Sequence, residues 1–354
     1  MSRIGLIDRR QLISAAVAAT FVPAGLGATP SMAWAAEPRI RVTNGRAIAG
    51  IRRAMIGSFG LNFVTERSAS QSSGGGFRSR LGPSNLNVRT ALTGLTPDDY
   101  VAAADAAYAA AIQALGTNGI EVVDNTALLA SLRGAVAPQP NGSSDQFSEG
   151  GGSSVEMVRY GPTPFGGFYP LQGWVTTGGG FAGIANMGAL RAGLSATEHL
   201  RQEARANDIA ILGLLLTVNP LKMSADQSSG WRVPDAFGNG GMTRTTTINT
   251  ETGLSSNPLK TWMDVYPASG RPGQVTVQGE IGVSGGIGAL EDTTSGTSRA
   301  IQGLGNVLSN PLLGGSGRSS NTTNYTLNAD SPSYIAGVGA LGFDVTEALA
   351  GPLG

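Results

Sequence analysis

The sequence predicts a mixed α/β fold, in which a central mixed β-sheet is flanked by helices and interrupted by long glycine-rich loops. Between residues 54 and 133 the expected order is strand, helix, strand, helix, which is typical of an α/β layer. Residues 207–220 are apolar at successive positions and bounded by turn residues, as in a strand buried on both faces at the centre of a sheet. From residue 242 onward, alternating patterns predict antiparallel strands in the C-terminal half.

An export signal is expected over residues 1–35. Arg9 and Arg10 precede a weakly apolar stretch, and Ala33 and Ala35 are the small residues that a signal peptidase requires. The arginine pair, followed by one residue and then two apolar ones, resembles a twin-arginine signal. The alternative is an ordinary secretory signal that contains two arginines. Either signal predicts a periplasmic or secreted protein of a Gram-negative bacterium.

The composition argues against several classes of partner and chemistry. The chain has 24 basic and 24 acidic residues, and the basic ones are scattered, which argues against nucleic acid as a partner. It has no cysteine, so disulfides, thiolate metal sites and thiol catalysis are excluded. No apolar run after the leader is long enough to span a bilayer as a helix. No complete cofactor motif is present, and no cofactor is expected.

Residues 36–95 are expected to contribute strands and one loop. Asn44-Gly45 lies between two short extended segments and predicts a tight hairpin. Apolar and polar residues alternate imperfectly over residues 54–65, which indicates a partly buried strand. Residues 68–90 are rich in serine, glycine and arginine and offer little apolar surface to bury, so a flexible insertion is expected there.

Thr96 marks the start of the clearest helix, which is expected over residues 97–115. Its hydroxyl can cap the helix, and Pro97 suits the first helical position. Asp98 and Asp99 place negative charge where the helix dipole favours it, so both are interpreted as caps and not as catalysts. The strand and helix that follow are expected at residues 120–123 and 125–133.

Residues 135–193 are expected to form a long insertion, because they consist largely of proline, glycine, serine and aromatic residues. Flat aromatic side chains on glycine-bounded loops can form a surface that stacks on sugars or binds a partner. The alternative is that these side chains attach the loop to the core. The candidate binding residues are Tyr160, Phe165, Phe168, Tyr169 and Trp174.

Ser195 and Glu198 form a capping-box pattern that predicts a helix from Ser195 to about Ala206, leading into the central strand. This helix holds His199, the single histidine of the chain, so any serine triad or imidazole metal site must use it. A histidine on a helix face is usually solvated or packed, and His199 is interpreted in that way. No catalytic, metal-binding or cofactor-binding residue is assigned.

Antiparallel strands are expected over residues 242–252, 261–266 and 274–284, the last two joined by a turn. Gly282-Val283-Ser284-Gly285-Gly286 matches the nucleophile elbow of α/β-hydrolases. No helical pattern follows it, however, and the required histidine should come after the serine, whereas His199 precedes it. A glycine-rich strand end is the better interpretation of this match.

The predicted organisation has three parts. Residues 1–35 are the export signal, and residues 36–292 form one α/β domain with flexible insertions at 68–90 and 135–193. Residues 293–354 form an extension rich in glycine, serine and asparagine, with peripheral turns and two short helices.

The order of these elements is similar to the envelope domain of the curli secretion channel family and of lipoprotein activators of cell-wall synthases. The resemblance rests on the strand Ala54–Thr65, the tyrosine-bearing helix Pro97–Leu115, the strand Gly119–Val123 and the helix that leads into the strand at Asp208. It implies a periplasmic domain without catalysis that acts by oligomerising or docking. The chain differs from these families in lacking a lipoprotein cysteine and in its glycine-rich insertions.

Three functional hypotheses follow. The first is an exported non-enzymatic envelope protein that binds or assembles with other envelope components, such as an envelope protein, a polysaccharide or copies of itself. The second is an exported hydrolase that uses carboxylates, since aspartate and glutamate are the only plentiful acid–base groups. The third is a structural protein of the surface or matrix, which the 53 glycines favour.

Overall fold

The computed structural model describes residues 39–73, 84–150, 153–174, 187–232, 241–283, 285–294 and 319–354. All of them belong to one compact unit, Trp34–Gly354. The expected export signal lies outside the described residues. Among the helices that are described, none is both long and apolar enough to cross a membrane.

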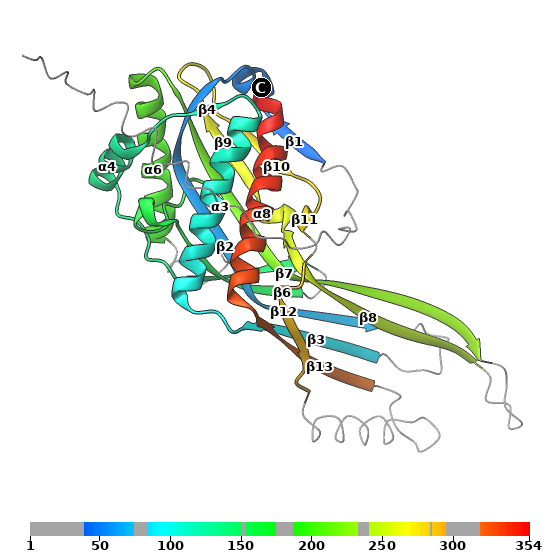
Figure 1. The fold of residues 1–354 in the computed structure, drawn as a ribbon. Coiled ribbons are helices and arrows are strands. Elements are labelled where there is room, and N and C mark those ends of the chain that lie inside the picture. The colour runs from blue at the N-terminus through cyan, green and yellow to red at the C-terminus, as the bar shows by residue number, and fades with distance from the viewer. Residues whose placement is uncertain are drawn as a thin grey trace, which may run out of the picture. The chain divides into compact units, whose positions relative to one another are not determined.

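The described residues form a mixed sheet of thirteen strands with helices against it, which confirms the predicted fold class (Figure 1). The main path of the sheet is β1-β10-β9-β7-β2-β3-β13-β12, and β4, β5, β6, β8 and β11 pair beside it. The strands are β1 (Ile40–Thr43), β2 (Arg53–Ser73), β3 (Ser84–Thr93), β4 (Glu121–Val122), β5 (Ser143–Gly150), β6 (Ser153–Tyr160), β7 (Ala210–Arg232), β8 (Gly241–Ser256), β9 (Trp262–Tyr266), β10 (Gly273–Val277), β11 (Gly282–Val283), β12 (Gly288–Asp292) and β13 (Ser319–Ala329). The helices are α2 (Gly45–Ile48), α3 (Pro97–Thr117), α4 (Thr126–Ala135), α6 (Met187–Ala206) and α8 (Ser331–Ala350), with single 3₁₀ turns η1 (Thr163–Phe165), η2 (Pro258–Lys260) and η4 (Gly351–Leu353).

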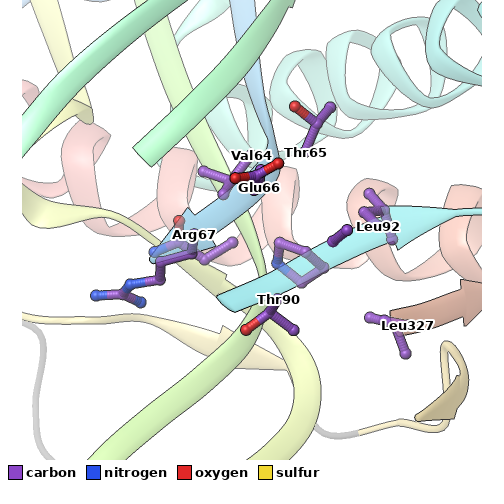
Figure 2. Close-up of a pocket in the computed structure, with 10 residues that line it drawn as sticks. Val64, Thr65, Glu66, Arg67, Thr90, Leu92 and Leu327 are labelled. Atoms are coloured by element: carbon purple, nitrogen blue, oxygen red, sulfur yellow. The ribbon is translucent and has the colours of Figure 1, made fainter. Parts of the chain in front are cut away.

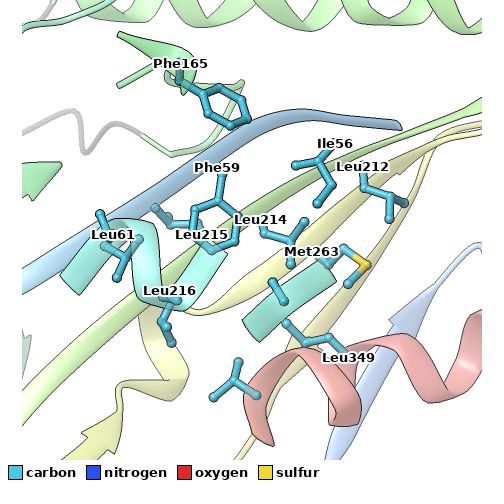
Figure 3. Packing of buried hydrophobic residues seen from close by; sticks show 14 of the residues in the cluster. Ile56, Phe59, Leu61, Phe165, Leu212, Leu214, Leu215, Leu216, Met263 and Leu349 are labelled. Carbon is cyan, nitrogen blue, oxygen red and sulfur yellow. The ribbon is translucent and has the colours of Figure 1, made fainter. Parts of the chain in front are cut away.

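The predicted central strand is confirmed as the first half of β7. It lies between β2, with which it pairs in parallel, and β9, with which it pairs antiparallel. Leu212 illustrates the arrangement, since it pairs with Ile56 of β2 and Val265 of β9 and is fully buried. Figure 3 shows the leucines of β7 within the main core, together with Met263 and Leu349 of neighbouring elements. An apolar residue at successive positions fits a strand covered on both faces.

The alternation of side chains along β2 separates the two covered faces of the sheet. Phe59 and Phe63 contact tyrosines of α3, with ring centroids 5.3 Å from Tyr108 and 5.0 Å from Tyr100. On the other face, Ser58 donates a hydrogen bond of 2.6 Å to the carbonyl of Tyr169. Helix α3 therefore covers one face, and the segment before Trp174 covers the other.

Helix α3 begins as the sequence predicts. The backbone N–H of Asp99 donates to the Thr96 hydroxyl at 3.3 Å, and the Asp99 carboxylate accepts from the Thr96 N–H at 2.7 Å. Pro97 occupies the first helical turn. Two hydrogen-bonding groups left over at the helix start are thus satisfied reciprocally.

Helix α8 corrects the prediction of short peripheral helices in the C-terminal extension. It is 20 residues long and buries Tyr334, Val338, Leu341, Val345 and Leu349 among other residues. It packs closely on α3, because a Cβ placed on Gly342 would lie 3.0 Å from Ala107. Small residues allow such close approach, and the helix lies in the core although the sequence around it is rich in glycine. Residues 301–313, the other short apolar segment of the extension, lie outside the described residues.

Two local predictions are wrong, namely the hairpin at Asn44-Gly45 and the helix start at Ser195. Asn44 adopts the left-handed conformation (φ 56°) that its type favours, but it leads into α2 and not into a hairpin. β1 instead pairs with the distant strand β10. Helix α6 begins at Met187, so Ser195 lies within the helix and does not cap it. Packing extends this helix: Gly193 is buried, and a Cβ placed on it would lie 3.1 Å from the carbonyl of Leu171.

Parts of both expected insertions belong to the sheet. β2 continues to Ser73 and pairs with β3 from Ser84 onward, while β5 and β6 form a hairpin that joins β2. Low hydrophobicity suggested loops, yet a strand whose backbone hydrogen bonds are satisfied by neighbours needs few apolar side chains. The remaining residues of the two insertions, 74–83, 151–152 and 175–186, lie outside the described residues.

Candidate functional site

The sheet divides where β7 separates from β2. The two strands are paired up to Phe63 and Val218. Beyond this level, β2 pairs with β3, starting from Glu66. β7 no longer pairs with β2 there and pairs with β8. The β7–β8 register shifts between Asn219 and Leu221. The residue between them, Pro220, has no N–H to donate, so it interrupts the regular ladder at this point.

Past this division, β7 and β8 form a two-stranded ribbon, defined here as residues 221–232 and 241–252. Its twelve residue pairs run from Leu221 with Thr252 to Arg232 with Gly241. Figure 1 shows the ribbon continuing beyond the helices. Within the described residues, these two segments pair only with each other, so each strand has one open edge. In an antiparallel pair, alternate residues direct their N–H and C=O groups to such an edge.

A small cleft lies between the ribbon's base and β3. Figure 2 labels Glu66 and Arg67 of β2 and Thr90 and Leu92 of β3 among the residues that line it, and Arg67 pairs with Thr90 across the two strands. The Arg89 guanidinium donates two hydrogen bonds to the Glu66 carboxylate, of 2.5 and 2.6 Å. The residues that line the cleft are Val64, Thr65, Glu66, Arg67, Thr90, Ala91, Leu92, Asn219, Pro220 and Leu327.

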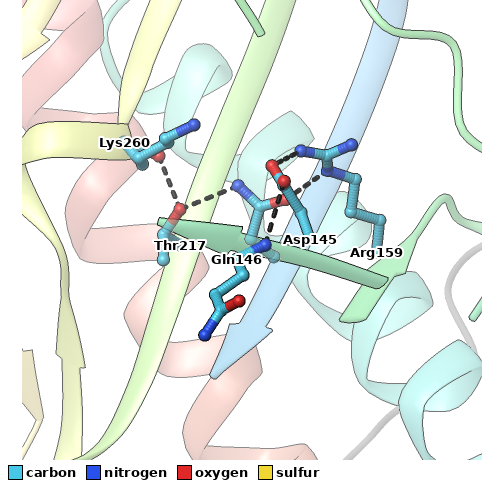
Figure 4. Close-up of polar contacts among 6 residues, drawn as sticks. Asp145, Gln146, Arg159, Thr217 and Lys260 are labelled. Carbon is cyan, nitrogen blue, oxygen red and sulfur yellow. Dashed lines mark hydrogen bonds and ion pairs between the residues drawn. The ribbon is translucent and has the colours of Figure 1, made fainter. Parts of the chain in front are cut away.

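A buried polar cluster lies at the same level of the sheet (Figure 4). Arg159 of β6 forms an ion pair with Asp145 of β5 and donates from Nε to the Asn62 side-chain oxygen at 3.3 Å. The Asn62 amide donates to the Thr217 hydroxyl at 3.0 Å, and that hydroxyl donates to the backbone carbonyl of Lys260 at 2.7 Å. The cluster therefore joins β5, β6 and β2 to β7 and to η2, which follows β8.

The charges of this cluster are withdrawn from water. The side chains of Arg159 and Asp145 are only 5% and 9% exposed. Burial lowers the pKa of Arg159, and the Asp145 charge opposes that effect. Burial also lowers the pKa of Lys260, whose ammonium lies 5.3 Å from the ring centre of Phe147. The Asp145 charge opposes this effect, and the ring face adds electrostatic stabilisation of the ammonium. These buried side chains cannot reach a ligand in solution, so their chemistry is structural.

The five candidate aromatic residues do not form a surface. Tyr160 is 6% exposed, and the other four are fully buried. Phe168 and Trp174 pack on the sheet at Gly60, where a Cβ would lie 2.1 Å from the Phe168 ring. Trp174 also extends the contact across β7 at Gly213. This arrangement corresponds to the alternative in which the aromatic residues attach the segment to the core, and it leaves no stacking platform there.

His199 lies between α6 and α4 and contacts two polar residues. Its Nε2 atom is 2.9 Å from the Ser131 hydroxyl and 3.5 Å from Glu203. Ser131 also donates to Glu203 at 2.6 Å. In a serine triad the acid binds the opposite ring nitrogen and orients the base. Here Glu203 and Ser131 face the same nitrogen, so the contacts tie two helices together and do not form a proton relay.

Asp264 is the buried carboxylate that the sequence analysis did not single out. It accepts hydrogen bonds from Trp174 Nε1 at 2.6 Å and from the Gln274 amide at 2.9 Å. Burial raises its pKa to about 6, and these two bonds oppose the rise. The signal available in the sequence was a single charged residue within the apolar strand Trp262–Tyr266. Arg159 and Asp145 gave no such signal, because each strand also contains another charged residue, Glu156 in β6 and Glu149 in β5.

Metal and acid–base chemistry find little support among the described side chains. No group of three or more histidine, aspartate or glutamate residues in the described ranges is placed to hold a metal ion. The cleft at Pro220 contains one carboxylate, Glu66, and a surface hollow beside His199 contains one, Glu198. A carboxylate-based glycosidase requires two acidic groups that face each other.

Comparisons with known proteins identify no relative. No protein-family model, curated protein or solved structure matches the chain. The functional proposal therefore rests on the ribbon and on the buried polar cluster at the level where the sheet divides.

Proposed function

We propose that the protein is an exported, non-enzymatic component of the bacterial envelope that assembles with copies of itself through the open edges of the β7–β8 ribbon. The observation that carries this proposal is the length of backbone on the ribbon that pairs only within the ribbon itself. Twelve residues of each strand extend past the division of the sheet.

Such a ribbon is unusual on a protein that remains alone. Natural sheets protect exposed edges by short strands, proline, bulges or inward charges, because an open edge pairs with other chains. Residues 221–232 and 241–252 contain no proline, and only three and two charged residues respectively. Six of the twelve residues of 241–252 are threonine, a residue that favours strands. A two-stranded hairpin without further partners is marginally stable in water, so pairing at its edges would stabilise it.

The expected free energy of edge pairing is similar in size to the free-energy cost of association. A twelve-residue edge can form about twelve hydrogen bonds, each contributing about 0.5 to 1.5 kcal/mol net, or roughly 6 to 18 kcal/mol in all. Association costs roughly 4 to 15 kcal/mol in lost freedom of motion. The two ranges overlap, so assembly should depend steeply on the length of the edge.

The placement in the envelope rests on the sequence. The twin-arginine-like leader and the similarity to the curli secretion channel family both favour an exported protein that oligomerises or docks. The burial of the aromatic candidates favours a protein partner over a polysaccharide, because a flat stacking surface is what a sugar would use.

The ribbon can be removed cleanly because of its register. Leu221 pairs with Thr252, so an Asn-Gly turn between them closes a two-residue hairpin and deletes residues 222–251. A half-length variant places the same turn between Asp226 and Thr247, which also pair. The mass of the chain from residue 36 and of both variants is measured by light scattering and native mass spectrometry.

The parent is expected to form a discrete oligomer, the half-length variant a weaker one, and the variant without the ribbon a folded monomer. Circular dichroism and thermal melts check that each variant is folded. A ribbonless variant that assembles like the parent would exclude this interface. A parent that stays monomeric, but captures another envelope protein only when the ribbon is present, would replace self-assembly by docking.

A further inference from the structure

We infer that the buried ion pair of Asp145 and Arg159 is a positioning device, which fixes the direction in which the ribbon leaves the sheet. This inference rests on the proposed function for its biological meaning, since a fixed direction matters for an assembly with a defined number of copies. The structural part of the inference concerns one chain and can be tested on one chain.

The first observation is the place of the cluster. Asn62 lies two residues before Val64, where β2 leaves its pairing with β7, and Thr217 lies three residues before Pro220. The cluster therefore includes Asn62 and Thr217, which belong to the last pairs of β2 with β7 before the sheet divides. Asn62 and Arg159 are direct cross-strand partners in the β2–β6 pair, so the guanidinium is held beside the division by the backbone register.

The second observation is that both strands of the ribbon are held at their bases. On β7, Thr217 is bonded through its hydroxyl to Asn62 and to the Lys260 carbonyl. After β8, the backbone N–H of Asn257 donates to the Thr217 carbonyl at 3.0 Å. The Thr217 N–H in turn donates to the Thr261 hydroxyl at 3.1 Å. A rotation of the ribbon about its base would break several of these bonds together.

The third observation is the character of the contacts. Apolar packing tolerates small rotations, because it has little directional preference, whereas hydrogen bonds weaken steeply when their angles change. Buried ion pairs often add little net stability compared with apolar side chains of similar volume, and in some proteins they instead select one arrangement. A buried pair at a branch point of a sheet suits the second role.

The test replaces the pair by apolar residues and measures the ribbon's direction. The chain has no cysteine, so spin labels can be attached at two introduced cysteines, Gln113→Cys on the exposed side of α3 and Ser228→Cys in the ribbon. Electron paramagnetic resonance then gives the distance distribution between the labels. The variant combines Asp145→Leu with Arg159→Met. The matched control combines Glu121→Leu with Arg53→Met, an exposed cross-strand ion pair at the far end of β2.

The parent and the control, each diluted with an excess of unlabelled protein so that distances between copies do not contribute, are expected to show a single narrow distance peak. The apolar variant should still unfold in one cooperative thermal transition and lose the narrow peak, and where the parent is oligomeric it should give several assembly sizes instead of one. A folded apolar variant that retains the narrow peak overturns the inference. A parent that is monomeric refutes the proposed function, yet the distance measurement still decides the role of the ion pair.

A second variant covers the case in which the apolar pair prevents folding. Arg159→Lys keeps the positive charge beside Asp145 but removes the planar group that also reaches Asn62. It is expected to fold and to broaden the distance peak. A narrow peak in Arg159→Lys, equal to that of the parent, likewise overturns the inference.

Discussion

The replacement of Asp264 by asparagine should change how the stability of the protein depends on pH. Asp264 lies in the core, where it faces the indole N–H of Trp174 and the amide of Gln274, with Tyr266 and Arg201 near it. Its pKa is raised from 3.8 to about 6 by burial. The folded protein therefore binds more protons than the unfolded chain between about pH 4 and pH 6, and its stability falls as the pH rises through that window.

The magnitude follows from the difference between the two pKa values of Asp264. At about 1.4 kcal/mol for each pH unit, the rise from 3.8 to about 6 corresponds to about 3 kcal/mol of stability lost by pH 7. Asparagine has no charge to bury, and its side-chain oxygen can still accept from Trp174. Its amide group requires the Gln274 amide to turn over and accept, which is a local change.

The assay is chemical denaturation of the parent and the Asp264→Asn variant at several pH values from 4 to 7.5. The free energy of unfolding of the variant minus that of the parent should rise by about 3 kcal/mol from pH 4 to pH 7. Taking this difference cancels the other titrating groups, which both proteins share. A difference that stays flat across the range would refute the assignment of a raised pKa to Asp264.

Trp174→Phe supplies a second check on the same site. It removes a donor that stabilises the charged carboxylate, so the pKa of Asp264 should rise further. The pH window over which stability falls should then move upward in this variant. A window that moves downward would show that the indole N–H does not stabilise the charged form.

Three further predictions concern the core, the histidine and the leader. Leu212→Ala should lower the free energy of unfolding by about 2 to 5 kcal/mol, because Leu212 is fully buried in the central strand, and a denaturant melt equal to the parent's would contradict this. His199→Gln should cost less than about 1 kcal/mol in the same melts and leave assembly unchanged, since it loses one partly exposed hydrogen bond. Replacement of Arg9 and Arg10 by lysine should block export if the twin-arginine route is used; unchanged export in a fractionation assay would leave the general secretory route.

Elements whose stabilising contacts are local or strongly apolar could be predicted from the sequence. The capping box of Thr96 and Asp99 lies within four residues, and it marked the start of α3 correctly. The apolar run of β7 needs no knowledge of its neighbours to be placed in a core. The antiparallel pairing of β9 with β10 is also as predicted, with Val265 opposite Gly273. The expected strand over residues 274–284 is shorter, however, since β10 ends at Val277 and β11 pairs with β8.

Elements that depend on distant partners could not be predicted. β2 and β3 pair through residues 66–73 and 84–91, which are mostly polar and small. Backbone hydrogen bonds pair them within the sheet, where Val88 and Thr90 are also buried. A helix was expected within residues 334–349, but the length of α8 and its place in the core were not, because its glycines and alanines are favourable only against the matching small residues of α3. The buried polar cluster required five elements to be placed before its side chains could be seen to meet.

Pro220 separates the part of β7 that could be predicted from the part that could not. The sequence analysis took it as the end of the central strand, because the apolar run stops there. The strand continues to Arg232, but its neighbours change at Pro220. The part before Pro220 lies between β2 and β9, and the part after it pairs only with β8 among the described residues. The first half of β7 lies in the core, whereas the second half is mostly polar in sequence. Its backbone edge, which pairs with β8 alone among the described residues, is the edge that the proposed pairing with a second copy of the chain would use.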